Sequence, residues 1–393
     1  MRTLQPRIPT TAVVTAASLC LIASLTSATI AQTPSGVNAA LQHERPSIAS
    51  VDYDESGRFR VNGKSFFPIL LYDAPTDSKS GAPIFAELRD FGFNTLTCKA
   101  EATATLRREG FYGAVHHAKP GDDASGIFLV LGSDSPALYF KKDLLKQTAE
   151  ANAKSRAAVP NRPLANAIGY WEDEPQGVVD GKLPAKAVYE DLVAAIDVSA
   201  PYLYPVPYQP VASVGEAVRR AREATGGKKP IVPILQLFAW DAKARYPTIA
   251  ELRCMTYLAL VEGASGIGYY SYGHVTGQPK KTIAEVQPEL WKSVKQLNKE
   301  IAELGPILFA DAAESGLHHF GDENPVRSRA AKGGLPAVFV NPTSTKQELR
   351  LAESPAWLNA RTPDGRKLPF DGFVATLKLQ PFEVVVLRAA SER

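Results

Sequence analysis

Short apolar runs alternate with segments of helical spacing along the first part of the chain. The run Phe66–Tyr72 is almost continuously apolar, as in a strand buried on both faces, and within 84–91 the apolar residues recur on one helical face. The order repeats, with strand patterns at 94–98 and 111–116 and a short helical pattern at 103–109. This alternation predicts a parallel sheet with right-handed crossovers, and the chain is long enough for a (β/α)8 TIM barrel.

The alternation continues to about residue 304. Helical patterns cover 141–158, 185–196, 214–224, 248–262 and 288–304, and strand patterns cover 164–168, 198–204, 231–238 and 266–272. Thr248 and Glu251 have the spacing of a capping box, which predicts where their helix begins. Gly305 and Pro306 predict the end of the last helix, because proline interrupts helical hydrogen bonding.

The segment Ile127–Leu131 has a strand pattern that fits the alternation poorly. Only residues 117–126 separate it from the preceding strand, which is short for a helical crossover between parallel neighbours. Either the segment is an excursion, and 164–168 is the fourth barrel strand, or a crossover lacks its helix and 164–168 is the fifth. We favour the first interpretation.

The periodicity changes beyond residue 311. Short segments alternate between apolar and polar residues at 337–340, 348–351, 374–379 and 383–388, and Asp-Gly turns lie at 364–365 and 371–372. No helical pattern separates these segments. We therefore expect a barrel domain at 55–310, followed by a small all-β sandwich domain at 311–393.

The N-terminus has the pattern of a secretory signal peptide. Residues 1–31 combine two early arginines, an apolar stretch and a small-residue cleavage pattern, so we expect a cleaved signal and a secreted or periplasmic protein. Residues 32–54 are polar and predict a flexible lead-in. Asn62-Gly63 then predicts a hairpin turn. We find no further run long enough to cross a membrane, and expect no membrane contact after cleavage.

Composition narrows the function classes. The 393 residues are 45% hydrophobic and carry a formal net charge of +3, and we find no basic patch that would favour nucleic acid. The chain has no Gly-x-Ser-x-Gly elbow, phosphate-loop motif or zinc-ligand spacing, so we expect no metal and no cofactor. Cys98 and Cys254 lie in apolar surroundings, and whether they pair stays open, as does the oligomeric state.

The candidate chemistry follows the strand pattern 164–168. Two aromatic residues and three carboxylates, namely Tyr170, Trp171, Glu172, Asp173 and Glu174, come next, and then a proline that ends the strand. In α/β barrels the C-terminal ends of the strands meet at one mouth. Aromatic faces stack on sugar rings, and carboxylates act on hydroxyls and glycosidic oxygens. The segment therefore predicts a carbohydrate site.

At these positions the chain resembles secreted (β/α)8 glycoside hydrolases and related proteins. The resemblance lies in Asn62-Gly63-Lys64, Gly92–Thr95, Gly169–Pro175, Tyr204-Pro205, Pro247–Arg253 and Gly263–Tyr270, and covers roughly 55–310. It implies the barrel, the C-terminal sandwich, a general acid/base Glu after strand four and a nucleophile Glu after strand seven. Glu174 matches the first position. The second has no Glu, and the nearest carboxylate is Asp241.

The second carboxylate therefore stays open. Glycoside hydrolysis uses two carboxyl groups, about 5–5.5 Å apart in retaining enzymes and roughly 6.5–9.5 Å apart in inverting ones. Asp241, Asp173 and Asp73 lie at predicted strand ends and could serve as nucleophile, base or substrate ligand beside Glu174.

We expect an exported glycoside hydrolase acting on a poly- or oligosaccharide, with Glu174, Asp241 and Asp173 as catalytic candidates. The alternative is a non-catalytic carbohydrate-binding protein on a decayed glycosidase barrel. The candidate substrate contacts lie at predicted strand ends. They are Asp73, His116, Tyr170, Trp171, Glu172, Tyr202, Tyr204, Gln236, Trp240, Tyr270 and Tyr272. About half of the aromatic residues are expected to be barrel packing, and His117 points away from the face of His116.

Overall fold

A computed structural model gives the structure of the protein. It describes residues 43–76, 82–133, 143–169, 178–179, 183–241, 243–310, 319–320, 324–332, 334–352, 360–362, 365, 367–368, 370–371 and 374–389. These residues belong to one compact unit, Ala39–Arg393.

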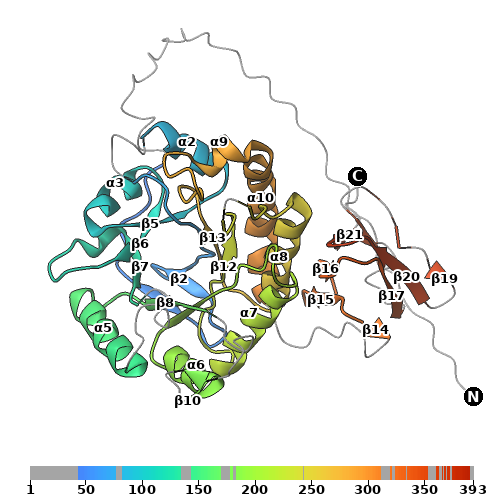
Figure 1. Cartoon of the computed structure of the whole chain (residues 1–393), viewed down its shortest axis with the longest axis horizontal. Coiled ribbons are helices and arrows are strands. Elements are labelled where there is room, and N and C mark those ends of the chain that lie inside the picture. Colours follow the sequence, from blue (N-terminus) through green and yellow to red (C-terminus); the bar gives the residue numbers. More distant parts are fainter. Residues whose placement is uncertain are drawn as a thin grey trace, which may run out of the picture. The chain divides into compact units, whose positions relative to one another are not determined.

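Within the described ranges, eight parallel strands close into a barrel (Figure 1). In order around the barrel they are β4 (Ile69–Leu71), β5 (Thr95–Cys98), β6 (Tyr112–His116), β7 (Ile127–Leu131), β8 (Leu164–Gly169), β11 (Val198–Tyr202), β12 (Ile234–Gln236) and β13 (Ile267–Tyr270). The surrounding helices are α2 (Ala82–Asp90), α3 (Thr103–Arg108), α5 (Leu144–Ala158), α6 (Ala185–Ala194), α7 (Ser213–Ala224), α8 (Ile249–Val261), α9 (Ile283–Val286) and α10 (Pro288–Ala310). A short hairpin of β9 (Val178–Val179) and β10 (Leu183–Pro184) precedes α6. The predicted TIM barrel is confirmed.

The predicted order of the strands was wrong at one place. β7 pairs with β6 on one side and with β8 on the other, so it is the fourth barrel strand and β8 is the fifth. The connection from β6 to β7 contains only a 3-10 turn, Ala124–Gly126. Two glycines make this short return sterically feasible. A Cβ at Gly126 would lie 2.7 Å from the Thr103 backbone oxygen, and one at Gly113 would lie 2.8 Å from the Cys98 Sγ.

A three-stranded antiparallel sheet near the N-terminus packs against the residues inside the barrel. It consists of β1 (Val51–Tyr53), β2 (Phe59–Val61) and β3 (Lys64–Ser65), and the predicted turn at Asn62-Gly63 makes a hairpin of β2 and β3. The rings of Phe59 and Phe66 meet that of Phe128 on β7 at 5.0 and 4.9 Å. Figure 1 draws β2 within the ring of barrel strands. The hairpin thus adds apolar side chains to the interior core of the barrel.

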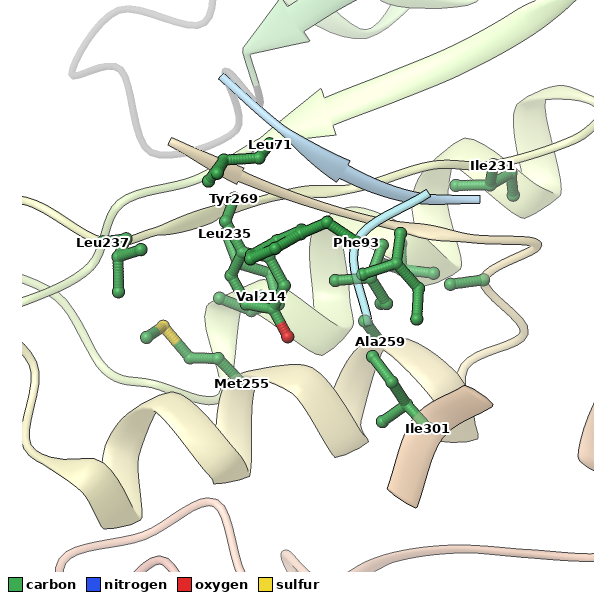
Figure 2. Packing of buried hydrophobic residues seen from close by; sticks show 14 of the residues in the cluster. Leu71, Phe93, Val214, Ile231, Leu235, Leu237, Met255, Ala259, Tyr269 and Ile301 are labelled. Atoms are coloured by element: carbon green, nitrogen blue, oxygen red, sulfur yellow. The ribbon is translucent and has the colours of Figure 1, made fainter. Parts of the chain in front are cut away.

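A second core lies between the barrel strands and the helices. Figure 2 shows Met255 and Ala259 of α8 beneath Leu235 of β12 and Tyr269 of β13, with Ile301 of α10 beside them. The capping box of α8 is confirmed, because the Thr248 side chain accepts from the Glu251 N–H and the Glu251 side chain accepts from the Thr248 N–H.

The last helix, α10, continues past its predicted end. It runs through Gly305 and Pro306 to Ala310. Leu304 and Leu308 are buried in the helix–barrel core on either side of the proline, and a Cβ at Gly305 would lie 2.8 Å from the Phe67 ring. Apolar packing on both sides therefore offsets the hydrogen bond that Pro306 removes.

The described C-terminal residues form two antiparallel sheets of four strands each. One has the order β14 (His319–Phe320), β17 (Gln347–Ala352), β20 (Val374–Leu379), β19 (Phe370–Asp371), and the other β15 (Arg327–Ala330), β16 (Ala337–Val340), β21 (Val384–Ala389), β18 (Ala360–Arg361). This confirms the predicted C-terminal all-β sandwich. Along β16, Ala337 and Phe339 belong to the sandwich core, whereas Val338 and Val340 belong to the helix–barrel core. Alternation along one strand thus joins the two cores.

Two questions left by the sequence are answered here. Cys98 and Cys254 are both buried and free, so they form no disulfide. No helix within the described ranges has the length and apolarity that crossing a bilayer requires.

Candidate functional site

An aromatic cluster lies at the C-terminal ends of the barrel strands. Its side chains lie at the last residue of β4, β6, β11, β12 or β13 or in the loop that follows, and no member comes from β5, β7 or β8. The members are Tyr72, His116, Tyr202, Tyr204, Phe238, Tyr270 and His274. We call this set the mouth cluster. Parallel strands bring these residues together because their carboxyl ends share one side of the barrel.

The centre of the mouth cluster is the pair Tyr204 and Tyr270. Their rings stack with centroids 5.8 Å apart and an interplanar angle of 23°. Phe238 meets both edge-on, at 5.0 Å from Tyr204 and 5.5 Å from Tyr270. Tyr270 also meets Tyr72 at 5.8 Å. Offset and edge-to-face contacts of this kind hold aromatic rings in fixed orientations.

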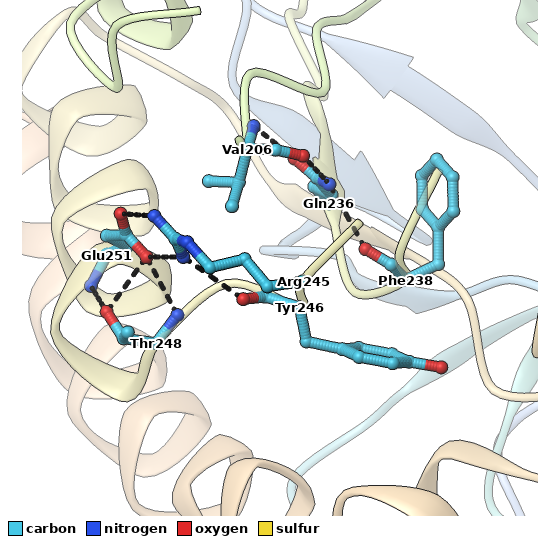
Figure 3. Close-up of polar contacts among 7 residues, drawn as sticks. All are labelled: Val206, Gln236, Phe238, Arg245, Tyr246, Thr248 and Glu251. Carbon is cyan, nitrogen blue, oxygen red and sulfur yellow. Dashed lines mark hydrogen bonds and ion pairs between the residues drawn. The ribbon is translucent and has the colours of Figure 1, made fainter. Parts of the chain in front are cut away.

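A buried amide joins the loops that carry these rings. The Val206 N–H donates to Gln236 Oε1 at 2.8 Å, and Gln236 Nε2 donates to the backbone oxygens of Val206 at 2.8 Å and Phe238 at 3.1 Å (Figure 3). Gln236 is 0% exposed. The amide thus ties the loop after β11 to the loop after β12. The sequence predicted that Gln236 contacts the substrate. In the structure the side chain is buried, and its amide nitrogen donates to two backbone oxygens of the protein instead.

The far end of the loop after β12 is held by an ion pair. Arg245 donates to both oxygens of Glu251, at 2.6 and 2.7 Å, and to the backbone oxygen of Tyr246 (Figure 3). Glu251 is 4% exposed and also closes the capping box of α8. Burial raises the pKa of the Glu251 carboxyl, but hydrogen bonds from Arg245 and Thr248 outweigh it, and the net pKa is lowered.

Asp241 lies in the middle of the same loop. It is exposed, its Oδ1 accepts from the N–H groups of Lys243 at 2.7 Å and Ala244 at 2.9 Å, and its Oδ2 accepts from the Tyr208 hydroxyl at 3.0 Å. The Lys243 N–H, the Tyr208 hydroxyl and the Ala244 N–H lower the pKa of Asp241. The carboxylate is therefore ionised at neutral pH, which suits a nucleophile, a base or a hydroxyl acceptor and not a proton donor.

Asp73 follows the first barrel strand at the same end. Its side chain is exposed and its φ is 58°, a left-handed value that non-glycine residues seldom adopt. A Cβ at Gly273 would lie 2.7 Å from the Asp73 backbone oxygen, so the loop after β13 passes close to it.

Tyr272 was predicted at the mouth and lies elsewhere. It is 4% exposed and belongs to the helix–barrel core, where its ring meets Trp291 of α10 edge-on at 5.3 Å. The chain leaves the strand after Tyr270, so the spacing of two residues no longer places both rings on one face. Among the predicted histidines, His116 meets Tyr72 at 6.3 Å, and His117 is exposed with a φ of 55°.

The acidic segment lies outside the described residues. This applies to Tyr170, Trp171, Glu172, Asp173 and Glu174. One prediction about this segment is nevertheless corrected. It follows the fifth barrel strand and not the fourth, because β8, which ends at Gly169, is the fifth strand. The family resemblance implied an acid/base after strand four. Strand four is β7, followed by Gly132 and Ser133 and then by residues outside the described ranges.

Three residues of this region were not predicted from the sequence. Phe238 and Trp240 share a face at a spacing of two residues, as do Tyr202 and Tyr204, and this repeated spacing could have identified Phe238. Tyr208 and His274 lie in loops, where no periodicity indicates direction.

The described residues offer neither a thiol nucleophile nor a metal cluster. Burial raises the pKa of Cys98 to about 12, and that of Cys254 is raised for the same reason. No group of three or more His, Cys, Asp or Glu side chains in the described part of the chain is arranged to hold a metal ion.

Solved structures show which proteins share this architecture. The chain is similar to a protein described as a glycoside hydrolase, with a TM-score of 0.59 and 13% identity over 88% of this chain and 98% of that one. It is also similar to a glycoside hydrolase family 5 protein from Bacteroides vulgatus, with a TM-score of 0.56 and 11% identity over 88% and 95% of the two chains. The resemblance to glycoside hydrolases is thus confirmed in the fold. No protein-family model matches the chain, and no curated protein matches it significantly.

Proposed function

We propose that this protein is an exported glycoside hydrolase that cleaves a glycosidic bond in an oligo- or polysaccharide. The observation that carries the proposal is the mouth cluster, which gathers aromatic rings at the end of the barrel where such enzymes bind their substrates. Ring faces in fixed orientations can stack on the apolar faces of sugars. The glycoside hydrolase fold supports the same reading.

Glu174 is proposed as the general acid/base. The assignment rests on the sequence Asp173-Glu174-Pro175, which begins four residues after the end of β8 at Gly169. It comes one strand later than the resemblance implied. A protonated Glu174 would give its proton to the glycosidic oxygen as the bond to the anomeric carbon breaks.

An ionised carboxylate must act together with this acid. Asp241, Asp73 and Asp173 remain the candidates for nucleophile, base or substrate ligand, and the lowered pKa of Asp241 fits any of these roles. If the carboxylate attacks the anomeric carbon and water then hydrolyses the glycosyl-enzyme, the two displacements give retention. If the carboxylate instead activates a water that attacks the anomeric carbon directly, the single displacement gives inversion.

The alternative function is carbohydrate binding without hydrolysis. One observation favours it. Asp241 is the carboxylate that follows strand seven, and both of its oxygens already accept hydrogen bonds from Tyr208, Lys243 and Ala244. A carboxylate with these hydrogen bonds stabilises the loop conformation, and this role requires no part in bond cleavage.

A panel of polysaccharides and aryl glycosides separates the two functions. The purified protein, residues 32–393, is incubated with each substrate, and reducing ends and released aglycone are measured beside equilibrium binding. Hydrolysis of at least one substrate is the expected result. Binding without new reducing ends would support the alternative, and neither binding nor hydrolysis would contradict both.

A further inference from the structure

Two exposed aromatic residues lie beside the mouth cluster on neighbouring loops. Among the described residues, the exposed large apolar side chains are Tyr208 (65%), Trp240 (46%), Ile249 and Ile307. The two aromatic ones follow β11 and β12, which are adjacent in the barrel. Large apolar groups that stay in solvent at one place often mark a binding surface.

Hydrogen bonds hold both rings in place without a ligand. Trp240 Nε1 donates to the Tyr204 backbone oxygen at 2.8 Å, and the indole meets Phe238 edge-on at 5.3 Å. The Tyr208 hydroxyl donates to Asp241 Oδ2 at 3.0 Å. Each of the two hydrogen bonds links the loop after β11 to the loop after β12. Because the rings are already oriented, a ligand would lose little side-chain entropy on binding them.

We propose that Tyr208, Trp240 and Asp241 form an outer subsite that binds sugar units distant from the bond to be cleaved. This assigns Asp241 the role of substrate ligand and leaves Asp73 and Asp173 as the candidate partners of Glu174 in bond cleavage. The subsite continues the mouth cluster, since the Trp240 ring lies 5.9 Å from that of Tyr204. The occupant is therefore a further part of the carbohydrate chain held in the mouth. This inference rests on the proposed function and adds that the preferred substrate is a chain of several sugar units.

The chemistry beside the rings favours a sugar over an apolar protein partner. Asp241 is exposed and ionised and lies next to Tyr208, and Lys243 is exposed in the same loop. Covering an ionised carboxylate with an apolar surface is costly, whereas a sugar hydroxyl can donate to it. An aromatic face with a hydroxyl acceptor at its edge is the combination that a sugar ring needs.

The test measures how affinity depends on chain length. Linear gluco-, xylo- and manno-oligosaccharides of two to six units are titrated by calorimetry into the wild type, Trp240→Ala, Tyr208→Ala and the control Ile307→Ala, which truncates an exposed apolar side chain on α10. In the series that binds, the wild-type Kd should fall at least tenfold between the disaccharide and the longest chain. Trp240→Ala should remove most of this gain, about tenfold for one stacked ring, while the disaccharide Kd changes by less than about threefold.

Trp240→Phe keeps a ring face and loses the indole hydrogen bond. This variant should therefore recover part of the increase in affinity with chain length that Trp240→Ala removes. Circular dichroism and the Tm of each variant confirm folding. If Trp240→Ala and Tyr208→Ala keep the full dependence on length, or if the wild type has none, the outer subsite is wrong while the proposed function stands. If the wild type binds and cleaves no carbohydrate of any length, the proposed function fails and the subsite with it.

Discussion

The side chain of Gln236 and the backbone of Val206 exchange two hydrogen bonds, each 2.8 Å long. This contact joins barrel strand seven to the loop after strand six, and a third bond reaches Phe238. The rings of Tyr204 and Phe238 lie on the two loops that it connects. The arrangement of the mouth cluster therefore depends on a residue that is itself fully buried.

Gln236→Leu should destabilise the protein. The substitution keeps the volume roughly constant but leaves the buried N–H and C=O groups of Val206 without a partner, which costs about 2–3 kcal/mol of unfolding free energy. Urea unfolding measures the loss. Gln296→Leu is the matched control, because Gln296 is exposed on α10 and its Nε2 donates to Glu300 Oε1, 3.2 Å away. Equal midpoints for both variants would contradict the role of Gln236.

Glu174→Gln should abolish most of the activity on a natural substrate. The amide keeps the shape of the side chain but has no proton to transfer, so the rate should fall by roughly two to four orders of magnitude. An activated aryl glycoside should be affected much less, because its leaving group needs little protonation. Glu289→Gln on α10 serves as the control. Unchanged kcat on the natural substrate would rule out Glu174 as the acid.

Glu251→Gln should lower the free energy of unfolding by an amount that depends on pH. The folded-state pKa of Glu251 is lowered, so its contribution to stability is present above the pKa of about 4.3 in the unfolded chain and is lost as the pH falls through the folded value. At pH 7 the variant should lose about 1–2 kcal/mol, since the capping box and the Arg245 pair are both weakened.

The comparison is made by denaturant unfolding at pH 7 and at successively lower pH. The difference between wild type and variant should shrink as the pH falls below about 4.3, because the carboxyl of the unfolded wild type is protonated first and that of the folded wild type follows at its lowered pKa. A difference that stayed constant down to the lowest pH at which the protein folds would show that the charge of Glu251 contributes nothing.

Arg329→Met should loosen the contact between sandwich and barrel. Arg329 of β15 donates to the backbone oxygens of Val261 at 2.9 Å and Leu308 at 3.0 Å, which lie at the C-terminal ends of α8 and α10. Burial and the neighbouring Arg222 lower the pKa of Arg329 to about 10, so the side chain is still charged at neutral pH. Removing it leaves terminal carbonyls unpaired, at a cost of about 2–3 kcal/mol.

Arg327 provides the control on the same strand. Its side chain is half-exposed and lies 3.6 Å from Glu262, so Arg327→Met should cost less than about 1 kcal/mol. Thermal and urea unfolding of the two variants give the comparison. A larger loss for Arg327→Met than for Arg329→Met would contradict the assignment.

The sequence by itself determined most elements of the fold and the end of the barrel at which aromatic residues gather. Apolar runs identified the barrel strands, because they reflect burial. The spacing of Thr248 and Glu251 identified the capping box, and the Asn62-Gly63 pair identified the turn, because both depend on local backbone geometry. The aromatic residues at strand ends indicated the mouth, since parallel strands must bring their carboxyl ends together.

Only the tertiary structure decided how these elements meet. β7 is strand four because Gly113 approaches Cys98 closely and Gly126 approaches Thr103, and these contacts between different elements let a 3-10 turn replace a helix. Gln236 is buried and bonds the loops after β11 and β12, so it is not at the surface where the sequence predicted a substrate contact. Tyr272 packs against Trp291 and not at the mouth, because the strand ends at Tyr270. Residue spacing predicts the face of a strand or helix on which a side chain lies. Whether that face is covered depends on packing against segments that are distant in sequence, which no local pattern encodes.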